Sequence, residues 1–96
     1  MDKIDLLRKQ IISRFAGMTF DMDYRLCVPS VHAKWRNEEL IVDFGGNIRS
    51  ITSGFPKDKA DMVSRWAVMH RDEIMRNHLM VGQGAEPLKM IDPLPE

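Results

Sequence analysis

Cysteine occurs once in the 96-residue sequence, at Cys27, so no disulfide can form within the chain. Chains without disulfides are typical of reducing compartments, and we expect a cytoplasmic protein. No charged start followed by an apolar run, the pattern of a signal peptide, is found. No apolar run approaches the roughly 20 residues that span a bilayer. We therefore expect no membrane partner.

An excess of positive charge is also missing. Fourteen lysines and arginines balance fourteen aspartates and glutamates, so the formal net charge is zero. General nucleic-acid binders neutralise phosphates with a clear basic excess, and this composition does not favour nucleic acid as a partner. The three histidines lack zinc-ligand spacing, and Gly45-Gly46 is not followed by the lysine and helix of a phosphate loop. We expect neither a metal nor another cofactor.

The segment over residues 17–53 has the pattern of a strand meander. Apolar and polar residues alternate from Met18 to Leu26 and again from Val31 to Trp35, and weaker alternation follows over 40–44 and 48–53. The segments between them carry turn signals at residues 36–39, where Asn37 tolerates a left-handed conformation, and at 45–47, where two glycines precede an asparagine. Such short connections favour antiparallel neighbours, so we predict a sheet of about four strands.

Helical spacing is found on both sides of this meander. Over residues 2–14, apolar side chains recur every three or four positions, which predicts a short amphipathic helix as an N-terminal extension. Over 56–81, Val63, Trp66, His70 and Ile74 recur in the same way, which predicts one long helix. Gly82, Gly84 and the following prolines end that helix, and residues 83–96 are expected to form an extended tail.

The whole chain, residues 1–96, is therefore expected to be a single α+β domain, with a short helix first and one long C-terminal helix covering the sheet. Within it, Trp35, Trp66 and His70 are expected to have structural roles, because His70 shares an apolar stripe with Trp66. The sheet face beneath the long helix is expected to carry Phe20, Met22, Tyr24, Ala33, Trp35, Val42 and Phe44.

The opposite face of the sheet holds the candidate site. Counting by twos places His32 with Lys34 and Arg36, and suitable strand pairing adds Arg25 and several aspartates. A histidine beside carboxylates and cations is the residue set of a metal-independent nuclease, with His32 as the candidate base and Arg25, Lys34 and Arg36 as candidate phosphate ligands. The alternative is an ordinary solvated face with cross-strand ion pairs.

Several short motifs occur in an order that resembles a known family. They are Ile12-Ser13-Arg14-Phe15 before Gly17, Pro29 before His32-Ala33, Phe55-Pro56, the run from Trp66 to Ile74, and the ending from Gly84 to Leu94. Over about residues 12–95 the chain resembles the small bacterial proteins catalogued as domain of unknown function four thousand one hundred and sixty. Members carry two histidines before the second strand, whereas Ser30 replaces the first of them here. The resemblance implies a small bacterial protein encoded beside another, as in toxin–antitoxin pairs.

Two functional hypotheses follow from these observations. The first is a non-catalytic protein-interaction or regulatory module that acts as a homodimer or with a small co-encoded partner. Two amphipathic segments, a sheet edge and eight methionines, which suit either a core or an adaptable binding surface, support it. The alternative is an RNA-directed toxin of a toxin–antitoxin-like pair that uses the face around His32. The neutral charge and the missing histidine at Ser30 favour the first hypothesis.

Overall fold

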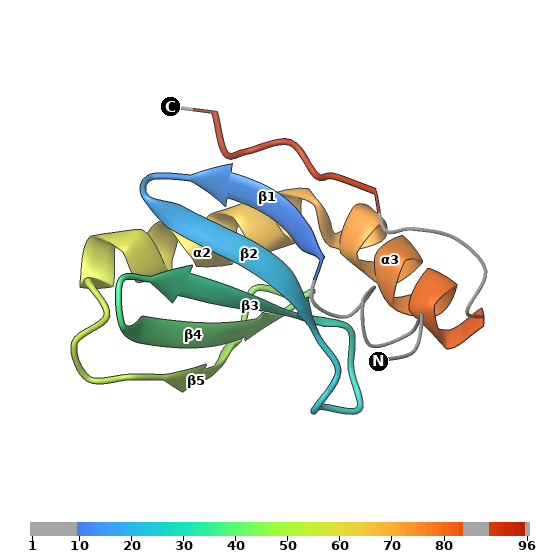
Figure 1. Cartoon of the computed structure of the whole chain (residues 1–96), viewed down its shortest axis with the longest axis horizontal. Helices are drawn as coiled ribbons and strands as arrows, with labels where there is room; N and C mark the ends of the chain where they lie inside the picture. Colours follow the sequence, from blue (N-terminus) through green and yellow to red (C-terminus); the bar gives the residue numbers. More distant parts are fainter. Residues whose placement is uncertain (1–9, 84–88, 96) are drawn as a thin grey trace.

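The computed structural model describes residues 10–83 and 89–95, with side chains to residue 80 and again from 89, and shows an antiparallel sheet followed by two helices (Figure 1). The sheet contains five strands in sequence order: β1 (Ile11–Phe15), β2 (Met18–Asp23), β3 (Ser30–Trp35), β4 (Glu38–Asp43) and β5 (Ile48–Ile51). The helices are α2 (Lys57–Met69) and α3 (Arg71–Gln83). The predicted α+β class is confirmed, and the strand count is five rather than four.

The additional strand is β1, which corrects the helix predicted over residues 2–14. Residues 2–9 of that helix lie outside the described residues, but residues 11–14 belong to the sheet. A bulge inserts Ile12 between the pairs Ile11–Asp21 and Ser13–Phe20, so Ile12 and Ser13 are both buried. This breaks the two-residue alternation that marks a strand, and the adjacent apolar residues then resemble helical spacing.

The helix predicted over 56–81 is two helices, separated at His70, where φ is −111° and ψ is 25°. No proline or glycine stands at the break. The chain changes direction there because α2 packs on β4, whereas α3 packs on β2 and β3. The His70 N–H still bonds to the Trp66 carbonyl and the Ile74 N–H to the His70 carbonyl. The helical period therefore continues across the break, which explains why the sequence pattern predicts one helix.

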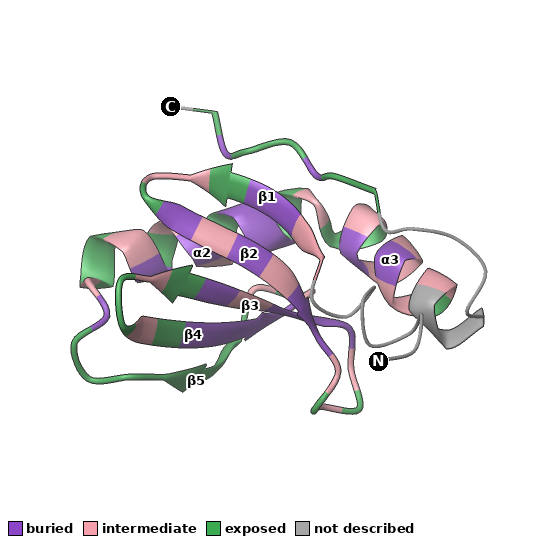
Figure 2. Cartoon of the chain, in the orientation of Figure 1, coloured by how far each residue is buried: buried purple, intermediate pink, exposed green. Residues whose placement is uncertain are grey.

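The buried residues of the sheet and the helices face one another and form the core (Figure 2). Trp66 is fully buried within this core. The rings of Phe20 and Phe15 lie 4.7 and 5.8 Å from the Trp66 ring. The predicted core face is confirmed: Phe20, Met22, Ala33 and Val42 are buried, and Tyr24, Trp35 and Phe44 are partly buried against them. Ile91 and Leu94 from the C-terminal segment complete this core.

Two details of the strands differ from the prediction. The first predicted strand was expected to run to Leu26, but β2 ends at Asp23, where the carboxylate accepts hydrogen bonds from the backbone and side chain of Arg25. That local bond turns the chain out of the sheet. In the turn between β3 and β4, the left-handed residue is Arg36, with φ of 53°, and not Asn37.

Residues 89–95 form an extended segment, here called the tail, that runs beside the outer edge of β1 (Figure 1). The Ile91 N–H donates to the Ile12 carbonyl at 2.7 Å. The two edges of the sheet therefore differ: the tail lies along β1, and β5 forms the opposite edge.

Candidate functional site

His32 lies in the middle of the sheet face that points away from the helices. Register places it between Asp21 on β2 and Ile41 on β4. Its Nδ1 lies 2.8 Å from Asp21 Oδ1, and its Nε2 lies 3.0 Å from Glu39 Oε1. The ring therefore links β2, β3 and β4 across this face.

These two carboxylates favour the charged imidazolium. The hydrogen bond to Asp21 raises the pKa of His32 above its ordinary value, burial acts in the opposite direction, and the charges of Asp21 and Glu39 reinforce the rise. An imidazolium that donates from both nitrogens has no lone pair left to accept a substrate proton. The geometry is that of a cross-strand clamp rather than that of a free general base.

The cations predicted to surround His32 are placed at different ends of the face. Arg25 follows β2 and binds the Asp23 carboxylate at 2.6 Å. Arg36 lies in the turn at the opposite end of β3, where its guanidinium stacks 4.5 Å from the centre of the Trp35 ring. Lys34 is exposed and paired in register with Thr19 and Glu39, next to the row that holds His32. Arg25 and Arg36 therefore do not converge on His32.

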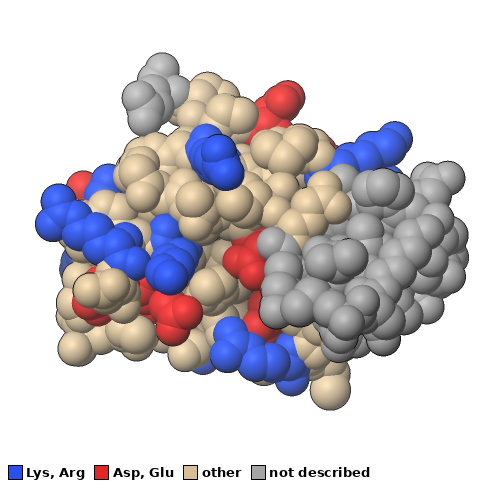
Figure 3. All heavy atoms as spheres, viewed as in Figure 1, with Lys and Arg blue, Asp and Glu red and all other residues tan. Residues whose placement is uncertain are grey.

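Basic and acidic side chains alternate on the face seen in Figure 3, over the part of the chain that the structure describes. No continuous basic surface is seen there, and such a surface is what phosphate backbones require. The same described residues contain no group of three or more histidine, cysteine, aspartate or glutamate side chains arranged to hold a metal ion.

The residues predicted to be structural lie in or against the core. Trp66 is fully buried and donates from Nε1 to the Asp92 carbonyl at 2.8 Å. His70 marks the break between the helices, with Nδ1 2.7 Å from Glu73 Oε1 and its ring 5.8 Å from Trp66. Trp35 is partly buried, and the Lys59 ammonium lies 5.9 Å from its ring centre.

Two buried polar residues have roles that the sequence pattern did not predict, although it placed Asp43 on the polar strand face and Asn77 on the apolar stripe of the helix. Asp43 ends β4, is 5% exposed, and accepts bonds from the Gly45 and Asn47 amides and from the Arg49 guanidinium. Burial would raise the pKa of Asp43, but the hydrogen bonds from Asn47, Arg49 and Gly45 outweigh burial and hold that pKa below its ordinary value. A signal was present in the sequence, since Asp43 and Phe44 precede the turn residues Gly45, Gly46 and Asn47. The other is Asn77, fully buried, whose role depends on a contact with Lys89 that spacing cannot reveal.

The β5 edge is the second candidate site. All four residues of β5 are exposed, including Ile48 at 40% and Ile51 at 46%. Register pairs these isoleucines with Val42 and Leu40, so both lie on the helix side of the sheet. Arg49 is the inserted residue of a bulge and turns its guanidinium to Asp43, 3.1 Å away. The exposed Val68 of α2 lies beside Gly46, in the turn that leads into β5.

Comparison with known proteins gives one match. A family model described as "Domain of unknown function (DUF4160)" matches residues 17–78. Neither the comparison with curated proteins nor that with solved structures found a match. Among the described residues, neither helix is long and apolar enough to cross a membrane.

Proposed function

The chain belongs to the DUF4160 family, and we propose that it acts as a small, non-catalytic protein-interaction module whose β5 edge pairs with a strand of another polypeptide. The observation that carries this proposal is the exposure of β5 along its whole length. A strand at the edge of a sheet has N–H and C=O groups that point away from its one neighbour, and a second strand can bind them.

In natural proteins, charged side chains on an edge strand or a segment that covers it often prevent the edge from pairing with another chain. The tail lies along β1, and β5 is the other edge. The charged residue of β5, Arg49, is bound to Asp43 on the same chain. This leaves Ile48 and Ile51 as the exposed side chains that an added strand would cover.

The sequence of β5 is compatible with pairing to β5 of a second copy of this chain. A two-fold axis between Arg49 and Ser50 places Ile48 of one copy opposite Ile51 of the other, and Arg49 opposite Ser50. Like charges are not opposed in this antiparallel arrangement. The four isoleucines then form one apolar strip on the helix side, continuous with the two cores. The protein would act as a homodimer with a joined sheet.

Sedimentation velocity over a protein concentration series tests this pairing. We expect the wild type to form a dimer as concentration rises, and Ile51→Lys to remain a monomer because two lysines would face apolar side chains in the joined strip. Leu79→Lys is the matched control, since Leu79 is 54% exposed on α3, and this variant should dimerise like the wild type. A wild type that stays monomeric, or loss of the dimer in the control alone, contradicts the proposal.

The RNA-directed toxin remains a prediction from the sequence, and the engaged ring of His32 gives it no added support. Expression in bacteria separates the two functions. We expect wild type and His32→Ala to be tolerated equally. Growth arrest by the wild type that His32→Ala abolishes would replace the interaction module with the toxin.

A further inference from the structure

The tail lies in a groove between β1 and the two helices, where groups of the core bind its backbone. The buried Asn77 carboxamide donates to the Lys89 carbonyl at 3.1 Å and accepts from the Lys89 N–H at 3.2 Å. Trp66 Nε1 donates to the Asp92 carbonyl, and the Ile12 carbonyl accepts from the Ile91 N–H. The groove therefore binds both donors and acceptors of an extended backbone, as a neighbouring strand does.

Side chains of the tail contribute to binding at two positions only. Ile91 is 2% exposed and Leu94 is 9% exposed, whereas Met90, Asp92 and Pro93 are exposed. Because backbone bonds do not distinguish one sequence from another, the groove selects only for extended conformation and for two aliphatic side chains three positions apart. Segments other than the tail meet those requirements.

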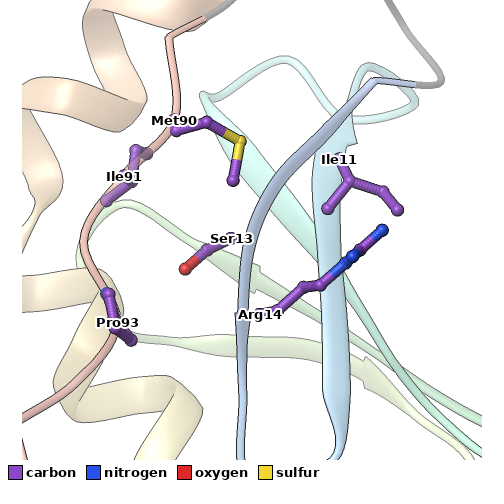
Figure 4. A pocket seen from close by; sticks show the side chains of 6 residues that line it. All are labelled: Ile11, Ser13, Arg14, Met90, Ile91 and Pro93. Carbon is purple, nitrogen blue, oxygen red and sulfur yellow. The ribbon is translucent and has the colours of Figure 1, made fainter.

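The tail does not fill the groove. A cavity of about 340 Å³ lies between the tail and β1, lined by Ile11, Ser13, Arg14, Met90, Ile91 and Pro93 (Figure 4). Ser13 is 1% exposed, its hydroxyl is turned toward the tail in Figure 4, and this buried oxygen has no hydrogen-bond partner. Buried hydroxyls without partners are rare, because each loses its bonds to water without replacing them. Pro93 has no N–H to donate, and the tail offers Ser13 no bond at this point.

We propose that this groove is a binding site for an extended segment of a partner protein, with aliphatic residues at the positions of Ile91 and Leu94. Between them, the segment carries a hydrogen-bonding side chain that fills the cavity and pairs with Ser13. When the partner is absent, the tail occupies the site, but it neither fills the cavity nor forms a hydrogen bond with the Ser13 hydroxyl. This site is on the opposite edge of the sheet from β5 and does not depend on the function proposed above.

Two fluorescein-labelled peptides test the site. The first has the tail sequence of residues 89–96, Lys-Met-Ile-Asp-Pro-Leu-Pro-Glu, and the second differs only by Pro93→Asn, which supplies an N–H and a carboxamide. The host is the full-length chain with Ile91→Asp and Leu94→Asp, which weakens its own tail. Fluorescence anisotropy measures the affinity of each peptide for this host, and circular dichroism checks that the host is folded.

We expect both peptides to bind the host, and to bind the wild type more weakly because its own tail competes. The Pro93→Asn peptide should bind about fivefold more tightly than the tail peptide, the equivalent of one net hydrogen bond. Adding Ser13→Ala to the host should remove that difference and leave the affinity of the tail peptide unchanged. A purely structural role for the groove would not produce this dependence on Ser13.

Three results overturn the proposal: no binding of either peptide to a folded host, equal affinities for the two peptides, or an advantage of the second peptide that persists with Ser13→Ala. If the double variant does not fold, Leu94→Ser alone serves as the host. The wild type then provides a further readout, because displacement of its own tail frees the Ile91 N–H from the Ile12 carbonyl and shifts the NMR signal of that N–H. An unshifted signal at saturating peptide counts against the proposal.

Discussion

Two buried polar side chains, those of Asp43 and Asn77, bind backbone groups of other segments and so fix local structure. Asp43 uses one carboxylate to bind the backbone of the turn that follows it, and Asn77 binds the backbone of a segment 12 residues away. The local motif around Asp43 could in principle be predicted, since an aspartate two residues before a Gly-Gly-Asn turn can accept hydrogen bonds from the turn amides. The contact between Asn77 and Lys89 could not be predicted, because no local sequence pattern specifies which distant residue a helix side chain will contact.

His32 makes the stability of the protein depend on pH. Its pKa is raised in the folded state, so its contribution is fully present below about 6.5, the ordinary value, and is lost as pH rises through the folded pKa. In urea unfolding from pH 6 to pH 9, wild type should lose more stability than His32→Gln. Because the pair with Glu39 is partly exposed, the difference at pH 6 should be roughly 1 kcal/mol or less.

Asp21→Asn provides the control for this effect, because it leaves the ring in place and removes the first cause of the raised pKa. Its pH dependence should lie between those of the wild type and His32→Gln. Parallel curves for wild type and His32→Gln would show that the clamp contributes nothing to folding.

Both the backbone conformation and the close neighbours of Gly46 disfavour a residue with a side chain at this position. Its φ is +84°, and a Cβ would lie 2.5 Å from Val68 Cγ2 and 3.1 Å from the Ser64 carbonyl oxygen. Gly17 has a similar φ of +77°, but a Cβ there would meet Trp35 at an ordinary 3.6 Å. In urea unfolding we expect Gly17→Ala to cost about 1–2 kcal/mol, the cost of the left-handed conformation, and Gly46→Ala to cost clearly more. Equal losses would show that Val68 and Ser64 move aside freely.

At the scale of elements, alternation predicted the strands well where the sheet is regular. From Met18 to Asp23 and from Val31 to Trp35, every second side chain faces the core, and those faces were predicted correctly. Prediction was wrong at β1, because its bulge buries the adjacent Ile12 and Ser13 and removes the alternation. It also missed the break at His70, because backbone hydrogen bonds keep the helical period intact across it.

The connection between α3 and the tail depends on Asn77. In Asn77→Ala, the N–H and C=O of Lys89 lose their partners, and we expect a loss of roughly 2 kcal/mol in the free energy of unfolding. Leu79→Ala, at a position that is 54% exposed on α3, should change stability by no more than about 0.5 kcal/mol. A stability of Asn77→Ala equal to that of wild type in urea unfolding would show that the two bonds to Lys89 contribute nothing to holding the tail.

At the scale of the whole molecule, the two edges of the sheet, β1 and β5, are the surfaces that we propose to bind other polypeptides. On β1, the chain's own tail lies in a groove that it fills incompletely. On β5, exposed isoleucines follow a turn that Asp43 organises. The face between these edges carries His32 between two carboxylates, with Arg25 and Arg36 at opposite ends. The distribution of chemistry therefore favours contact with polypeptides at the edges over catalysis on the face.

Hydrogen–deuterium exchange at low and high protein concentration tests whether β5 pairs with a second copy of the chain, because it locates the interface as well as detecting it. We expect the amides of Ile48–Ile51 to exchange more slowly at high concentration, and those of β2 and β3 to exchange at the same rate at both concentrations. Exchange of β5 that does not depend on concentration, or protection that appears on the His32 face instead, would contradict this pairing.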